Sequence, residues 1–430
     1  MTKRRNMSDP KIEGGNKWGD GLDKTEKGGI ISSLPNARRI ILQHPYLKDC
    51  FGWSEKDEAI MLMRDLPDFE NVRFPRSGVG YPCLLQDKHF TYVSDLISSI
   101  TQSNFNEKYI HAAVQNAAVQ NSYDPLVNYL RGLEWDGESR LTEWLHHGFG
   151  AEETSLNGSM GFMFLIAAVR RACFRQYKFD SMLVLEGEKG IKKSSGIREL
   201  FGNDYFLEGI PDIRRDNSTQ ILAGMWGVEI PEGKGFLCAD AGTQKEFLSK
   251  VDDTYRRPYH RCPITVSRSV VFIMTTNDTE YMIDGAGDRR FWPVRCGVSQ
   301  MPDIDWIKEN RDQIWAEAYH YAMLKNDKGE FEHKTYMEDA EMALLTREQE
   351  DRLAPEPWEE ILRVHFNTEG DLGIQEISMP TILRDILTIP VDRQDRATQT
   401  KVGRIMRDMG WQKRRSLRDK TRSYIYVRQK

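Results

Sequence analysis

The sequence has little of what marks a membrane, secreted or zinc-binding protein. Its longest strongly apolar stretch, Met160 to Val169, is much shorter than the roughly 20 residues that a transmembrane helix needs. The start, MTKRRNMSDPKIEGG, is polar and lacks the apolar core of a signal peptide. The six cysteines form no CxxC pair, and the nine histidines show no metal-ligand spacing. We therefore expect a cytoplasmic protein with reduced thiols, without a membrane partner, a zinc site or a disulfide framework.

The mild net charge of −5 hides a strong asymmetry. Residues 401–430 contain eleven lysines and arginines against two aspartates, a local net charge of +9. The rest of the chain therefore carries a net charge of −14. A basic terminal segment on an acidic body indicates that this segment binds a polyanion.

Composition and periodicity divide the chain into five segments. Residues 1–34 are polar and glycine-rich, so we expect a disordered tail. Apolar residues at helical spacing predict a helical N-terminal domain over 35–154. An α/β domain follows over 155–325. A helical linker over 326–357 then leads to a small terminal domain at 358–430.

Two tryptophans are expected to join helices near the end of the N-terminal domain. Residues 123–145 read as helix, turn, helix, with the turn at Asp136-Gly137. Trp135 and Trp144 would then pack these two helices together.

Strands and helices alternate in the central segment. Apolar runs predict strands at 182–186, 225–230 and 269–275. Helices are expected before, between and after them, at 158–176, 194–201, 240–251, 303–325 and 336–353. This alternation predicts an α/β fold in which a three-layer sandwich surrounds a mainly parallel sheet.

The stretch LVLEGEKGIKKSS, residues 183–195, has the order of a phosphate-binding loop (P-loop) between a strand and a helix. Such a loop binds phosphate through backbone N–H groups, the positive potential of a helix N-terminus and a lysine. Lys193 supplies the lysine, and Ser194 supplies a hydroxyl for Mg²⁺. The alternative is a basic turn without a ligand. The candidate nucleotide-binding residues are Gly187, Gly190, Lys192, Lys193, Ser194 and Ser195.

Lys192 is a departure from the pattern G-x-x-x-x-G-K-[ST], which has glycine there. If the backbone enters the helix in the ordinary way, the lysine is tolerated and adds positive charge. If the position needs a positive φ, a side chain is strained, and we expect weak hydrolysis.

Polar residues follow two further strands. Glu229 and Glu232 lie at the end of GVEIPE, where a nucleotide hydrolase needs one acid for Mg²⁺ and another that orients the attacking water. Asn277 follows a buried strand and is placed to sense a γ-phosphate, because ligands of open α/β sheets lie at the carboxyl ends of strands. The alternatives are two surface carboxylates and an asparagine in a turn.

Paired arginines, Arg289 and Arg290, stand between a glycine-rich turn and an apolar strand. An arginine finger must be held rigidly to reach a phosphate, often on a neighbouring subunit. The alternative is a salt-bridged loop.

Basic and aromatic residues interleave between residues 245 and 259, which suits a loop that grips a nucleic-acid backbone and stacks on bases. Tyr255 and Tyr259 could equally pack a structural loop. The candidate DNA-binding residues of this stretch are Lys245, Arg256 and Arg257.

In this order, the motifs resemble the virulence-associated protein E family of phages and mobile islands, whose ATPase domain is related to the superfamily-three helicases. The resemblance covers roughly 120–325 and is carried by YDPLVNYLRGLEWDG at 123–137, LVLEGEKGIKKSS at 183–195, GVEIPE at 227–232, FLSKVDDTYRRPYHR at 247–261, FIMTTND at 272–278 and GAGDRRFWPV at 285–294. It implies ATP and Mg²⁺ as cofactors and a ring assembly. The catalytic positions that it implies are Lys193, Glu229, Glu232, Asn277, Arg289 and Arg290, with Ser194 and Glu229 at the metal.

The terminal domain has the order helix, helix, helix, hairpin, which is that of a winged helix. Helices are expected at 358–366, 378–387 and 398–410. The third helix would enter the DNA major groove while the wing lies along phosphates. A solvated basic surface or a protein-docking winged helix is the alternative. The candidate DNA-binding residues are Lys401, Arg404, Arg407, Lys413, Arg414, Arg415, Arg418, Lys420 and Arg422.

These features together predict an ATP-dependent DNA helicase or a replication-initiator-type ATPase of a phage or mobile element. We expect a homo-oligomer, as a hexamer, that acts on DNA. A DNA-bound scaffold or regulator that binds nucleotide and hydrolyses it poorly is the alternative. A small-molecule P-loop kinase is disfavoured, because the paired arginines and the basic domain would then lack a role.

Overall fold

The computed structural model describes residues 18–69, 72–76, 80–215, 218–237, 239–256, 263–282, 288–353, 357–368, 376–415 and 424–428. The chain forms two compact units, with Met1–Asn277 and Arg290–Met337 in the first and Asp278–Arg289 and Glu338–Lys430 in the second. Across the described ranges, no helix combines the length and apolarity that crossing a membrane requires. The four described cysteines, at positions 50, 83, 173 and 296, are free.

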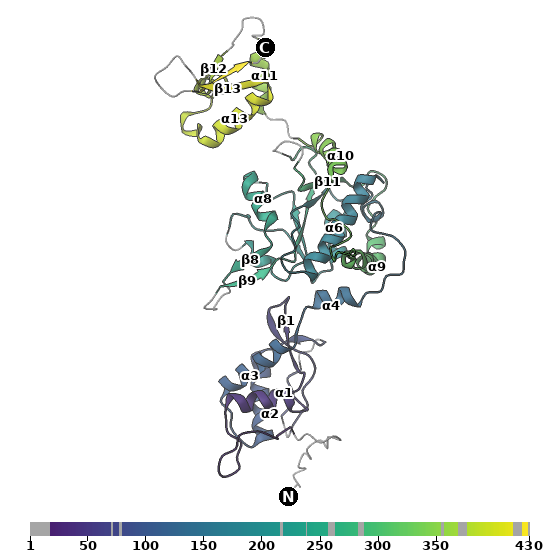
Figure 1. The fold of residues 1–430 in the computed structure, drawn as a ribbon, viewed down its shortest axis with the longest axis vertical. Helices are drawn as coiled ribbons and strands as arrows, with labels where there is room; N and C mark the ends of the chain where they lie inside the picture. Colours follow the sequence, from purple (N-terminus) through teal and green to yellow (C-terminus); the bar gives the residue numbers. More distant parts are fainter. Residues whose placement is uncertain are drawn as a thin grey trace. The chain divides into compact units, whose positions relative to one another are not determined.

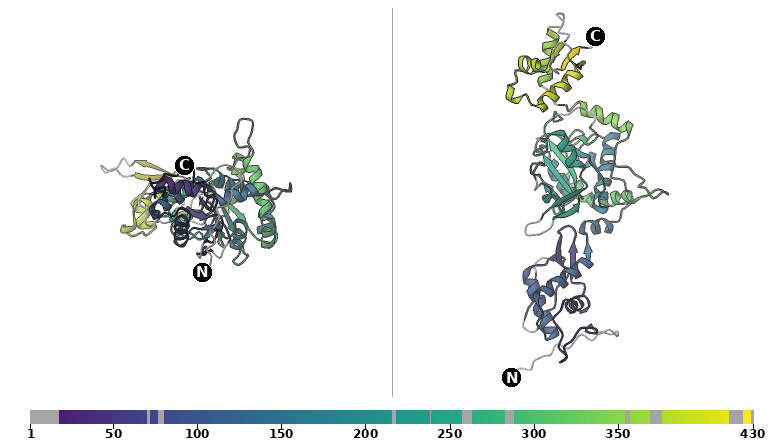
Figure 2. Two further views of the ribbon diagram at one scale, coloured as in Figure 1. Left: turned by 90° about the horizontal axis from the view of Figure 1, so that it is seen from below. Right: turned by 60° about the vertical axis from the view of Figure 1, so that its left-hand side comes forward.

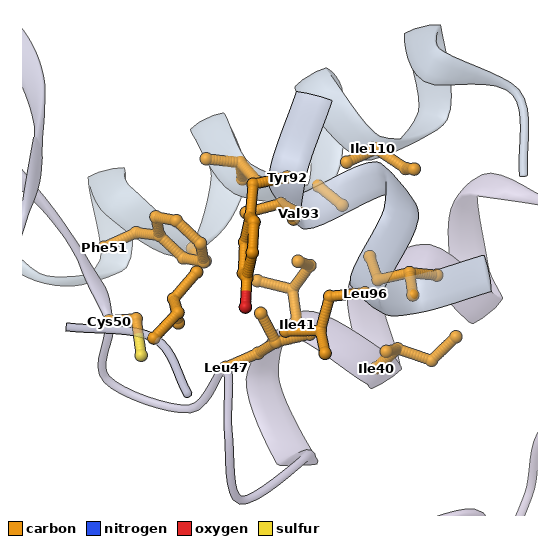
Figure 3. Packing of buried hydrophobic residues seen from close by; sticks show 14 of the residues in the cluster. Ile40, Ile41, Leu47, Cys50, Phe51, Tyr92, Val93, Leu96 and Ile110 are labelled. Atoms are coloured by element: carbon orange, nitrogen blue, oxygen red, sulfur yellow. The ribbon is translucent and has the colours of Figure 1, made fainter. Parts of the chain in front are cut away.

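The N-terminal part of the first unit packs three helices on a small sheet. The helices are α1 (Leu34–Gln43), α2 (Asp87–Thr101) and α3 (Glu107–Gln120), and the sheet has the order β3-β2-β1-β4. Its strands are β1 (Phe51–Ser54), β2 (Ala59–Leu62), β3 (Cys83–Leu84) and β4 (Ser122–Tyr123). Figure 3 shows side chains from the helices, such as Ile40, Leu96 and Tyr92, in the same core as Phe51 of β1.

The prediction of an entirely helical N-terminal domain is therefore wrong for this sheet. Strands of two to four residues are too short to show an alternating pattern of apolar and polar residues. The helices between residues 87 and 132, which are longer, show their period clearly.

A five-stranded parallel sheet forms the centre of the first unit, in the order β11-β5-β10-β7-β6. Its strands are β5 (Met182–Glu186), β6 (Phe206–Glu208), β7 (Gly227–Pro231), β10 (Val271–Thr276) and β11 (Phe291–Arg295). All residues of β5 and β10 are buried, as expected of parallel strands covered on both faces. The predicted α/β class with a parallel sheet is confirmed.

Helices cover both faces of this sheet (Figure 1). One face carries α6 (Ser155–Cys173), α7 (Lys193–Phe201) and α9 (Ile304–Met323). Trp226 beside β7 donates its indole N–H to Ala168 of α6 at 2.9 Å. The other face carries α8 (Ala241–Ser249), whose Phe247 ring lies 5.2 Å from Phe272 of β10. Figure 2 shows the strands side by side in a second view.

The expected contact between Trp135 and Trp144 is wrong. After α4 (Pro125–Gly132) the chain is not helical until α5 (Trp144–Phe149). The Trp135 ring instead lies 5.0 Å from His320 of α9, and the Trp144 ring packs on Phe149 and Phe164.

The second unit contains α10 (Asp339–Glu350) and a small α/β core. Its helical elements are α11 (Pro357–Thr368), α12 (Met379–Thr381) with a π-helical continuation over Ile382–Ile386, and α13 (Arg396–Asp408). The strands β12 (Glu376–Ser378), β13 (Trp411–Arg415) and β14 (Tyr424–Arg428) form an antiparallel sheet in the order β12-β14-β13. The predicted order of three helices and a hairpin is present, with one additional strand, β12.

Candidate functional site

The loop between β5 and α7 follows a path that needs glycine. Gly187 has φ 149°, and a Cβ there would lie 2.7 Å from Ile191 Cδ1 and 3.0 Å from the carbonyl oxygen of Cys296. Gly190 has φ 89°. The loop therefore folds tightly over the carboxyl end of β5 before Lys193 begins the helix.

Lys192 occupies the left-handed region, with φ 66° and ψ 27°, at the N-cap of α7. The sequence left open whether this position is an ordinary helix entry, and the structure shows that it is not. A residue with a Cβ is strained there, and such strain is found at functional sites where surrounding structure enforces it.

Lys192→Gly is expected to raise the free energy of unfolding by about 1 kcal/mol, because a left-handed residue with a Cβ costs roughly 1–2 kcal/mol and the freedom of glycine in the unfolded chain offsets part of the gain. Urea unfolding measures this change. Lys192→Ala removes the same charge but keeps the Cβ, so its stability should match the parent. Equal stability of the Gly and Ala variants would contradict the strain.

Lys193 is held at the centre of the loop. Only 7% of the residue is exposed, and its ammonium donates to the carbonyl oxygens of Gly187 at 2.6 Å and Glu188 at 3.0 Å. A third bond, at 3.2 Å, reaches Asn277 Oδ1. Burial lowers the pKa of the Lys193 ammonium below its usual value. The ammonium thus lies between two carbonyl oxygens of the loop and the side chain that follows β10.

Glu229 of β7 lies beneath the start of α7. Its Oε1 accepts hydrogen bonds from Ser194 Oγ and Thr275 Oγ1, both at 2.6 Å. The residue is fully buried, and within the described chain its Oε2 has no hydrogen-bond partner. Burial raises the pKa of this carboxyl above its usual value. A buried carboxylate oxygen without a donor can take a proton, a water or a cation.

A second carboxylate is tied to the same cluster through Asn277. The amide nitrogen Nδ2 of Asn277 donates to Glu232 Oε1 at 2.7 Å, while its Oδ1 accepts from Lys193. Glu232 itself has φ 51°, and its backbone N–H donates to Thr275 O at 2.7 Å. Asn277 therefore connects the ends of β5, β7 and β10 in one hydrogen-bonded chain.

The residues at the carboxyl ends of β5, β7 and β10 could hold a magnesium ion whose remaining ligands are waters and phosphate oxygens. No group of three or more histidine, cysteine or acidic side chains that could hold a metal occurs among the described residues. Mg²⁺ binds through one or two carboxylates together with waters and substrate phosphates. Ser194 Oγ and the unpartnered Oε2 of Glu229 match that donor set.

Arg290 lies at the opposite edge of the sheet from the loop. Arg290 precedes β11, where its carbonyl accepts from Met182 N at the amino end of β5, and its guanidinium lies 3.3 Å from Asp180. The five residues of β5 separate this edge from the loop by roughly 15 Å, at a rise of about 3.3 Å per residue. Arg289 is exposed. The structure does not bring Arg290 to the loop of the same chain.

Comparisons with known proteins identify the family. The model of the virulence-associated protein E-like domain matches residues 130–354, more than half of the chain. The chain belongs to this family. A search of curated proteins gives no match. Two similar solved structures are apo structures of the NrS-1 C-terminal region, each at 12% identity, TM-score 0.45 and 88% coverage of this chain, with 96% and 95% coverage of the respective neighbours.

The virulence-associated protein E-like match includes the loop, both acids, Asn277 and the arginine pair. The N-terminal helices and sheet lie outside this match, and so does the small terminal domain. The motifs in the sequence were therefore sufficient to predict the family, and this prediction is confirmed.

Sequence reasoning missed three residues that the structure brings to the cluster. Thr275 is the second donor to Glu229. Arg295 ends β11 opposite Glu186, with Nε 3.9 Å from Glu186 Oε2. Cys296 is buried with its thiol near Lys193, and burial raises the pKa of that thiol to about 12. Their contribution depends on strand pairing, which no local pattern shows.

The predicted DNA-binding residues fall in both units. In the first, Lys245 lies on α8 and the exposed Arg256 follows β8 (Asp252–Tyr255), while Arg257 lies outside the described residues. In the second, Lys401, Arg404 and Arg407 lie on α13, and Lys413, Arg414 and Arg415 lie on β13. Arg418, Lys420 and Arg422 lie outside the described residues.

The basic face of α13 is opposite its core face, as its sequence predicts. Val402, Ile405 and Met406 are buried, whereas Arg407 is exposed. Lys401 lies 4.7 Å from the Trp358 ring, so its charge also packs against α11.

Proposed function

We propose that this protein is a Mg²⁺-dependent ATPase that acts on DNA in the replication of a phage or mobile element. One observation carries the proposal. Lys193, Ser194, Glu229, Glu232 and Asn277 form a connected cluster around a glycine-dependent loop, at the carboxyl ends of three adjacent strands. In this proposal the loop 187–192 is a P-loop and the three layers are those of a P-loop NTPase.

Each residue of the cluster has a distinct task in ATP hydrolysis. Lys193 turns its ammonium from the loop carbonyls to the β- and γ-phosphates. Ser194 and Glu229 hold Mg²⁺, which neutralises phosphate charge when bound. Glu232 orients the attacking water, and Asn277, already bonded to both Lys193 and Glu232, senses whether a γ-phosphate is present.

The location of the arginine pair supports a homo-oligomer. Since Arg290 lies at the far edge of the sheet from its own loop, an arginine of this pair can complete a pocket only on a neighbouring subunit. A closed ring with one such contact at each interface satisfies every pocket. We infer a ring, with a hexamer as the expected size.

The second unit supplies a DNA contact in this proposal. Its three helical segments and antiparallel sheet match the elements of a winged helix, with α13 as the recognition helix. The exposed Arg407 and the cations of β13 face solvent. They would bind DNA phosphates in a salt-dependent manner.

The strained Lys192 favours one competing function, a DNA-bound scaffold that holds nucleotide with little turnover. ATP hydrolysis measured with and without single-stranded DNA separates the two. Magnesium-dependent turnover supports the ATPase. Nucleotide binding without turnover would leave the scaffold, and the absence of nucleotide binding would contradict both.

Glu229→Gln is expected to lower ATP turnover by roughly 10²-fold, since it weakens the metal site. The same change should stabilise the nucleotide-free protein by about 1–3 kcal/mol at neutral pH, because a neutral amide replaces a carboxylate whose negative charge is buried. Urea unfolding and turnover measure the two effects. Glu309→Gln, an exposed substitution on α9, is the matched control and should change neither.

The stability gain of Glu229→Gln should depend on pH. The folded-state pKa of Glu229 is raised above the usual value of 4.5, so the parent carries its full stability below that value. It loses stability as the pH rises through the folded pKa. The difference between variant and parent should therefore vanish near pH 4 and grow toward neutral pH. A difference independent of pH would contradict burial as the cause.

A further inference from the structure

A cleft of about 680 Å³ lies beside the hairpin of β8 and β9 (Ile264–Ser267). One wall is formed by residues 213–215 and 218–220, and the other by the end of α8 with β8. Its volume is within the range of clefts that bind ligands. It shares no lining residue with the nucleotide loop.

Positive charge predominates in the cleft. Its charged lining residues are the cations Arg214, Arg215, Lys250 and Arg256 and the acids Asp252 and Asp253. Asp253 is buried and accepts from Arg268 Nε at 2.7 Å. Arg268 neutralises that carboxylate from outside the cleft, while Asp212 and Glu246, which also lie outside the lining, pair with Arg214 and Lys250.

One wall presents its arginines from a fixed turn. Asp212 accepts from the backbone N–H of Arg214 at 3.0 Å through Oδ1, and its carbonyl accepts from Arg215 N at 2.9 Å. The Arg214 guanidinium binds the Asp212 carboxylate, which lowers the pKa of Asp212 to about 2. Arg215 is exposed and pairs with no carboxylate in the described part of the chain. Arg215 is therefore the cation most available to a ligand.

Buried arginines fix the opposite wall. Arg171 donates to the carbonyl oxygens of Lys250 at 2.9 Å and Phe179 at 2.7 Å, and burial lowers its pKa to about 9. Arg268 donates to the Phe247 carbonyl at 2.6 Å. The backbone beneath the Lys250 side chain is thus anchored to the core. The ammonium of Lys250 belongs to a partly exposed side chain and lies 3.6 Å from Glu246 Oε1.

We propose that this cleft binds the phosphates of single-stranded DNA, with Arg215 and Lys250 as direct contacts. The inference depends on the DNA function proposed above and adds Arg215 and Lys250 to the predicted DNA-binding residue Arg256, which also lines the cleft. Tyr255 also lines the cleft, and cations beside an aromatic ring are the combination that holds a single strand.

The double variant Arg215→Gln/Lys250→Gln tests the site in the full chain. Fluorescence anisotropy of a labelled oligo-thymidine follows binding over a series of salt concentrations. Loss of two contacts should weaken binding roughly tenfold and make the slope of log affinity against log salt shallower by about 1.4, since each single-strand phosphate contributes about 0.7. Arg215→Lys should retain the parent slope.

Lys308→Gln/Arg347→Gln removes the same charge from exposed positions outside the cleft and is the control. Thermal unfolding of all variants confirms that they fold. Bromodeoxyuridine in the oligonucleotide should cross-link to peptides spanning 213–220 and 247–256.

Three outcomes would count against the site. If the parent binds DNA and the double variant behaves like the control, the cleft is not the site while the DNA function stands. If the double variant loses affinity for polyglutamate but not for DNA, the occupant is an acidic peptide and the proposal is overturned. If the parent binds no DNA even at low salt, the DNA function itself fails.

Discussion

Lys193→Ala is expected to lower ATP turnover by roughly 10³-fold, the upper range for removing one preorganised donor from a developing charge. The structure explains why no neighbour can substitute. The ammonium donates to Gly187 O, Glu188 O and Asn277 Oδ1, so it occupies the centre of the loop. Lys192 has left-handed backbone angles and its side chain is exposed.

Calorimetry with a non-hydrolysable ATP analogue separates loss of binding from loss of chemistry. Lys193→Arg keeps the charge but presents a planar group to a loop shaped for an ammonium, and we expect it to bind nucleotide while hydrolysing slowly. Lys192→Ala is the matched control for charge in the same loop. If Lys193→Ala turned over ATP at the parent rate, the loop would not be the nucleotide site.

The lowered pKa of Lys193 adds a dependence on pH. The ammonium must be protonated to bind phosphate, and burial moves its pKa below the usual 10.5. Nucleotide affinity should therefore decline in alkaline solution earlier than for an exposed lysine. Nucleotide binding should weaken this pKa shift, because phosphate charge stabilises the protonated form.

The strands and the loop that carry the site could be predicted from the sequence, because each shows a pattern within a few neighbouring residues. Strands buried on both faces read as continuous apolar runs, and β5 was predicted with its observed bounds. The residues that follow such strands must lie at one edge of a parallel sheet. The positions of Lys193, Glu229 and Asn277 near one another follow from that rule.

Pairings between distant residues could not be predicted in the same way. The bond from Thr275 to Glu229 depends on which strands are neighbours and on their register. The proximity of Arg290 to Asp180 depends on β11 lying beside β5. Neither follows from composition or spacing, because each is decided by tertiary packing.

The backbone at Lys192 is the clearest case of a question that the sequence raised and could not answer. A lysine at a glycine position allows two backbone geometries. The structure gives the left-handed one, with φ 66° and ψ 27°, against the preference of a residue with a Cβ.

Arg289→Ala should lower ATP turnover by roughly 10³-fold, which is the effect of removing an arginine finger. A neighbouring subunit that retains Arg289 should restore the activity. Arg290 is held near Asp180, whereas Arg289 is exposed beside it. Asp288 is fixed through its carbonyl, which accepts from the buried Gln349 of α10 at 2.8 Å. The hydrogen bond to α10 therefore fixes the backbone directly before Arg289, and an arginine finger needs such a rigid support.

Mixing two inactive variants tests whether the arginine acts across an interface. Lys193→Ala subunits have an intact Arg289 and no working pocket, and Arg289→Ala subunits have the reverse. Activity should appear in the mixture because a pocket of one variant receives the arginine of the other. Arg290→Lys, which keeps the charge near Asp180, is the control and should remain active alone. An inactive mixture whose subunits still assemble with nucleotide would show that Arg289 does not act in trans.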